Sequence, residues 1–132
     1  EANEQQAKVA EFNDLCKPLA KLDCTIDQLN KIVKFAQDHP EFKSNPGYIQ
    51  AYNLRVCIYA LMGKNTSGTK YIDTSEDVKE AISVNKLPQK SKVFINNLMS
   101  NKTAFAALPL DGNFQSLSEI KDAIKNNAGV EL

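Results

Sequence analysis

The sequence predicts an all-α fold, a single compact bundle of five or six helices that forms one domain over residues 1–132. Apolar residues recur three and four positions apart in several segments, whereas the alternation that is typical of strands is nowhere sustained. Prolines and capping residues separate these segments. With 132 residues, of which 42% are hydrophobic and 24% charged, the composition fits one globular domain.

The first helix is expected from about residue 2 to residue 16. Val9, Phe12, Leu15 and Cys16 share one face of it, while the acidic residues lie elsewhere on the helical wheel. Pro18 interrupts this helix, because proline lacks the amide donor and clashes with the preceding turn.

The second helix begins with a capping box, in which Thr25 and Gln28 exchange hydrogen bonds between side chain and backbone. It has the most regular amphipathic pattern in the chain, and Pro40 marks its end. The residues that fill its apolar half are Ile26, Leu29, Ile32, Val33, Phe35 and Ala36.

The third helix has Asn45 as its cap, Pro46 at its first position and Gly63 just beyond its end. Its wheel is apolar on both sides of a row of tyrosines, so we expect a central helix that its neighbours pack against over most of its surface. The residues that mark its polar side are Gln50, Asn53 and Lys64.

The second half of the chain predicts shorter elements. After a loop over residues 63–70, a short helix is expected from residue 74, and another begins at Pro88. The segment around 100–115 is expected to be irregular, with an Asp-Gly turn near its end. A second capping box, Ser116 to Glu119, opens the last helix, which ends near residue 129.

Four polar and aromatic residues of the third helix form the candidate binding site. Tyr48, Tyr52, Arg55 and Tyr59 lie at positions i, i+4, i+7 and i+11, which places them on one helical face about 60° wide. Rigid aromatic rings and the planar guanidinium group anchor protein interfaces, because they give much contact area at a modest entropic cost. The alternative is that these tyrosines belong to the core, with their hydroxyl groups at its edge.

This pattern favours a non-enzymatic helical domain that mediates protein–protein interaction. One alternative is a carrier of a small apolar or aromatic ligand, held between helices and lined by the tyrosines; another is a small enzyme of unknown class. An exposed tyrosine row supports a partner interface, whereas an enclosed row supports a ligand pocket or plain core. For Arg55, the apolar surroundings predict either pairing with a carboxylate or a place in a binding site.

Charge and hydropathy argue against two classes of partner. The formal net charge is zero and no dense basic run occurs, so nucleic-acid binding is not expected. The longest apolar run covers only residues 56–62, far short of the roughly 20 residues that span a bilayer, so no membrane span is expected in a soluble chain.

The chemistry-bearing residues are few. Cys16, Cys24, Cys57 and His39 do not have the spacing of a metal motif, and no catalytic residue, metal or cofactor is assigned. If the second and third helices form a hairpin, a disulfide between Cys24 and Cys57 is possible; three reduced thiols are the slightly favoured alternative. The Gly-rich segment 63–70 lacks the residue order of a phosphate-binding loop.

The compartment stays open at this stage. The chain begins at Glu1 without methionine, so we expect that a preceding segment was removed, either by a signal peptidase or by design of the expressed chain. A secreted or extracytoplasmic location is slightly favoured over a cytoplasmic one.

Overall fold

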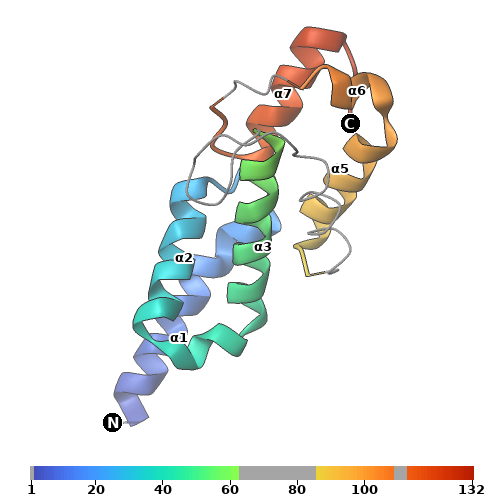
Figure 1. Ribbon diagram of the computed structural model, residues 1–132. Coiled ribbons are helices and arrows are strands. Elements are labelled where there is room, and N and C mark those ends of the chain that lie inside the picture. The colour runs from blue at the N-terminus through green and yellow to red at the C-terminus, as the bar shows by residue number, and fades with distance from the viewer. Residues whose placement is uncertain (1, 63–85, 109–112) are drawn as a thin grey trace.

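The computed structural model describes residues 2–62, 86–108 and 113–132, and these residues form an all-α fold, as predicted (Figure 1). Within these ranges, six α-helices and two 3₁₀ helices are present and strands are absent. The elements are α1 (Ala2–Cys16), η1 (Lys17–Ala20), α2 (Ile26–Asp38), η2 (Pro40–Ser44), α3 (Pro46–Leu61), α5 (Gln89–Ser100), α6 (Lys102–Ala106) and α7 (Leu117–Ala128).

The first three α-helices pack side by side, with α2 antiparallel to α1 and α3 (Figure 1). The N-terminal half of α1 extends beyond the other two helices, and its residues 3–11 are largely exposed. Phe12 is the first buried side chain of α1. Val9 is exposed, although the apolar pattern places it on the core face, because this part of α1 lies outside the bundle.

The starts of α2 and α3 form as the capping patterns predict. The Thr25 hydroxyl accepts a hydrogen bond from the Gln28 N–H at 3.2 Å, and Gln28 Oε1 accepts one from the Thr25 N–H at 2.9 Å. Asn45 Oδ1 accepts the Gly47 N–H at 2.8 Å, and Pro46 is the first residue of α3. These side chains satisfy amide donors that have no partner within the helix.

The capping box at the start of α7 is only half formed. The Ser116 hydroxyl accepts the Glu119 N–H at 3.4 Å, but Glu119 Oε2 accepts from the Gln115 N–H at 3.1 Å instead of the Ser116 N–H.

A cluster of rings holds the connection between α2 and α3 against α1. The ring centroids of Phe12, Phe35 and Phe42 lie 4.8 to 5.6 Å apart. The imidazole of His39 packs against Phe35 at 4.7 Å. Tilted and edge-on contacts of this kind add to the stabilisation that burial gives, so the turn at Pro40 is fixed by packing on both sides.

Backbone hydrogen bonds join the start of α7 to the start of α2. The Ile26 N–H donates to the Gln115 carbonyl at 2.7 Å, and the Ser118 N–H donates to the Leu22 carbonyl at 3.0 Å. The segment that leads into each helix therefore supplies an acceptor to an otherwise unpaired amide near the start of the other helix. This exchange positions α7 at the end of the bundle where α3 finishes (Figure 1).

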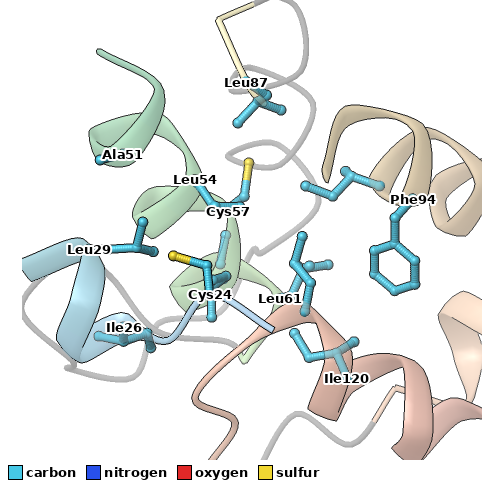
Figure 2. Packing of buried hydrophobic residues seen from close by; sticks show 14 of the residues in the cluster. Cys24, Ile26, Leu29, Ala51, Leu54, Cys57, Leu61, Leu87, Phe94 and Ile120 are labelled. Carbon is cyan, nitrogen blue, oxygen red and sulfur yellow. The ribbon is translucent and has the colours of Figure 1, made fainter. Parts of the chain in front are cut away.

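The hydrophobic core runs continuously from the N-terminal helices to the C-terminal ones. Figure 2 shows Leu29 of α2 on one side and Phe94 of α5 and Ile120 of α7 on the other, with Leu54 and Leu61 of α3 between them. The central position of α3 in this core agrees with its apolar sequence.

The segment 100–115 contains one element that the sequence analysis missed. Asn101 Oδ1 accepts the Ala104 N–H at 3.0 Å and caps the short helix α6. The Asx cap and the following alanines are sufficient for one helical turn. The loop expected at 63–70, the helix expected from residue 74 and the Asp-Gly turn lie outside the described residues.

The described helices give no candidate for a bilayer span. The longest of them has 16 residues, and none combines the length and the hydropathy that crossing requires.

Candidate functional site

The outward side of α3 carries the predicted row of tyrosines. We call Tyr48, Tyr52, Arg55 and Tyr59 the tyrosine–arginine face. All four side chains are at least partly exposed, and the Tyr52 side chain is 41% exposed. Ile49 and Val56, which flank this face on the helical wheel, are also partly exposed. The side of α3 nearest to solvent is therefore rich in aromatic and aliphatic groups.

Part of the side of α3 that the sequence predicts to be polar faces other segments of the chain and not solvent. Asn53 Nδ2 donates to the Lys86 carbonyl at 3.3 Å, in the segment that leads into α5, and to the Ile49 carbonyl at 2.9 Å. Cys57, which lies on the same side, is fully buried. The predicted polar side is thus partly covered: Asn53 is bonded to backbone and Cys57 is buried, whereas Gln50 is partly exposed and Lys64 lies outside the described residues.

Tyr48, Tyr52 and Arg55 contact one another along the face. The ring centroids of Tyr48 and Tyr52 are 6.1 Å apart, and the planes are inclined at 38°. The Arg55 Cζ atom lies 5.6 Å from the centroid of the Tyr52 ring. This distance is within the range of a cation–π contact, so the exposed Tyr52 ring and the guanidinium group form one unit.

Asn30 of α2 holds the guanidinium group from the other side. Arg55 Nη1 donates a hydrogen bond to Asn30 Oδ1 at 3.0 Å. The sequence analysis assigned no role to Asn30, because it lies 25 positions away on another helix. Only the packing of α2 against α3 brings the two side chains together, and no local spacing could have indicated the pair.

The positive charge of Arg55 has no counter-ion among the described residues. Three ion pairs join exposed side chains of the described residues, and none of them includes Arg55; they are Lys17–Asp14, Lys34–Asp38 and Lys125–Glu131. Arg55 Nε is buried, and no described residue accepts a hydrogen bond from it. Of the two predicted situations for Arg55, pairing with a carboxylate is therefore absent from the described part of the chain.

The four residues of the face differ in how they pack. Tyr48 and Tyr59 are half-buried and contact the hydrophobic core. Tyr52 is not part of that contact and faces solvent. The core interpretation thus fits Tyr48 and Tyr59 in part, whereas Tyr52 and Arg55 form the exposed centre of the face.

The three cysteines are free thiols. In Figure 2 the sulfur of Cys57 is directed toward Leu87, and the sulfur of Cys24 lies on the side of Leu29. Burial raises the pKa of the Cys16 thiol to about 11 and that of Cys57 to about 12. The pKa of Cys24 is raised to about 11, first by burial and then by the nearby charge of Asp23. Since the thiolate is the reactive form, these groups are weak nucleophiles at neutral pH.

A hollow of about 620 Å³ lies beside the end of α1 and the starts of α3 and α5. Its lining includes Cys16, Gly47, Gln50 and Pro88 and none of the residues of the tyrosine–arginine face. Among the described residues, no group of three or more His, Cys, Asp and Glu side chains is arranged to hold a metal ion.

Comparison of the chain with protein-family models, curated proteins and solved structures finds no match. The candidate site is therefore defined by its geometry. Its centre is Tyr52 with Arg55, held by Asn30 from α2, and Tyr48 and Tyr59 flank it along α3.

Proposed function

We propose that this chain is a non-enzymatic helical domain that binds a protein partner through the tyrosine–arginine face of α3. The observation that carries the proposal is the exposed Tyr52 ring, which packs on an arginine that has no counter-ion among the described residues. Tyrosine and arginine are the residue types most enriched at the energetic centres of protein interfaces.

The position of the face favours a partner over a small ligand. A carrier would enclose its ligand in a largely apolar cavity, whereas Tyr52 is 41% exposed and the hollow beside α1 is lined by other residues. The rigid packing of Tyr48 and Tyr59 on the core supports a preformed surface, which reduces the entropic cost of binding.

Affinity capture from the native source with matched variants tests the proposal. Tyr52→Ala removes the exposed ring, and Val93→Ala is the control, because Val93 is 47% exposed on α5 and lies outside the face. We expect the unmodified chain and Val93→Ala to retain the same partner. Tyr52→Ala should bind this partner about tenfold more weakly or worse. Circular dichroism should show both variants folded. Equal retention by both variants, or equal loss, would contradict the proposal.

A further inference from the structure

We infer that the partner presents a carboxylate to Arg55, and that Asn30 of α2 is a positioning residue of the same binding site. The inference rests on the proposed function and adds the chemistry of the partner. Arg55 Nη1 is bonded to Asn30 Oδ1, and the buried Nε has no hydrogen-bond partner among the described residues.

The described neighbours of Arg55 orient its guanidinium group without balancing its charge. Asn30 contributes a neutral amide oxygen and Tyr52 contributes a ring face, and neither carries a negative charge. A partly buried charge without a counter-ion carries a desolvation cost that a partner carboxylate offsets. Because Nε is covered by this chain, the donors that face a partner are those of the two Nη groups, and parallel N–H donors of this kind match the two oxygens of a carboxylate.

The carboxylates of α2 do not act as the counter-ion of Arg55. Asp27 lies one turn before Asn30, and no ion pair joins it to Arg55 within the described residues. Lys34 lies one turn after Asn30 on the same face, and its ammonium group pairs with Asp38 at 3.4 Å. Among the described residues, the cation that contacts the Tyr52 ring is the Arg55 guanidinium group.

One cation between aromatic rings fits a carboxylate better than a phosphate. Phosphate groups are usually recognised by clusters of arginines, whereas this chain has one arginine. The tyrosine rings, with Ile49 and Val56 beside them, offer apolar contact on each side of Arg55. The partner segment that fits is therefore an aspartate or glutamate between apolar residues.

Titration with short peptides tests this chemistry on the full chain. The probe is acetyl-Leu-Asp-Leu-amide, and its control is acetyl-Leu-Asn-Leu-amide, which has nearly the same shape without the charge. We expect the Asp peptide to shift the NMR signals of Arg55 Nε–H and the Tyr52 ring in a saturable manner, and to bind at least tenfold more tightly than the Asn peptide. Arg55→Lys, which keeps the charge but removes the fork, should weaken the Asp peptide at least fivefold.

A substitution at Asn30 gives the sharpest discrimination. Asn30→Asp places a carboxylate where Oδ1 now accepts from Arg55, so an internal ion pair should form and displace the partner. We expect loss of Asp-peptide binding together with an unchanged or higher unfolding midpoint. Asn96→Asp, at an exposed position of α5, is the matched control and should leave binding unchanged.

The outcomes separate this inference from the proposed function. Equal binding of the two peptides, absence of a saturable shift with the Asp peptide, or unchanged binding in Asn30→Asp each overturns the carboxylate assignment. A stronger effect of inorganic phosphate on the same signals also overturns it. If Tyr52→Ala still loses a captured partner in any of these cases, the proposed function stands alone. If Tyr52→Ala captures the partner as well as the unmodified chain does, the proposed function is wrong, and the inference that rests on it is wrong as well.

Discussion

The sulfur atom of Cys16 lies 2.6 Å from the position that a Cβ atom on Gly47 would occupy. Gly47 is in the first turn of α3, and Cys16 is the last residue of α1. Phe12 Cε2 is 3.3 Å from the same position. The absence of a side chain at residue 47 therefore allows the end of α1 and the start of α3 to approach closely.

We expect Gly47→Ala to lower the free energy of unfolding by about 1–3 kcal/mol, the usual cost of overpacking. The better helix propensity of alanine opposes this loss by about 1 kcal/mol. In a Cys16→Ala background the same substitution should cost much less, because the sulfur is gone. Urea unfolding of the four proteins of this double-mutant cycle measures the coupling; an equal loss in both backgrounds would show that the contact is unimportant.

Alanine substitutions should divide the tyrosine–arginine face into two groups. Tyr48→Ala and Tyr59→Ala remove half-buried rings that contact the core, and each should cost about 1–3 kcal/mol of stability, at or below the range of fully buried aromatic residues. Tyr52→Ala should cost about 0.5 kcal/mol or less, because its ring faces solvent. Thermal unfolding measures all three, and a large loss for Tyr52→Ala would make this residue structural.

Most of the helix boundaries could be predicted because their signals are local. The residues that mark each helix start lie within three positions of one another, and the first of them caps the helix. These residues are Thr25 and Gln28 for α2, Asn45 and Pro46 for α3, and Ser116 and Glu119 for α7. The interruption at Pro18 is also local, and the chain there forms the 3₁₀ turn η1.

The orientation of α3 could be predicted only in part, since it depends on distant contacts. The row Tyr48 to Tyr59 follows from helical spacing alone. The side of the helix that faces solvent is set by contacts with later parts of the chain. The Lys86 carbonyl accepts a hydrogen bond from Asn53, and α5 and α7 pack on the same side of the core. Asn30 belongs to the site through the packing of two helices, a relationship that periodicity within either helix does not contain.

Thiol titration of the denatured, unreduced protein should give three thiols, as the free cysteines of the structure indicate. A bridge between Cys24 and Cys57 stays a prediction for an oxidising compartment, where it would leave one thiol. In the folded protein, all three should react slowly with a thiol reagent at pH 7, because burial raises their pKa values. Rapid reaction of Cys57 in the native state would show that the core opens around α3.

The same thiols should make the fold less stable in alkali. The Cys57 thiol has a pKa of about 12 in the fold against an ordinary value of 9.0, so between these pH values the unfolded chain binds fewer protons at Cys57 than the folded chain does. The free energy of unfolding should therefore fall as pH rises from about 9 toward 12, and be unaffected by this group below pH 9. Lysines and tyrosines titrate in the same range, so the measurement is the difference in slope between the unmodified chain and Cys57→Ala. The cavity in that variant lowers its stability at every pH, whereas the loss of the thiol should flatten the alkaline part of its curve; parallel curves would mean that Cys57 ionises freely in the fold.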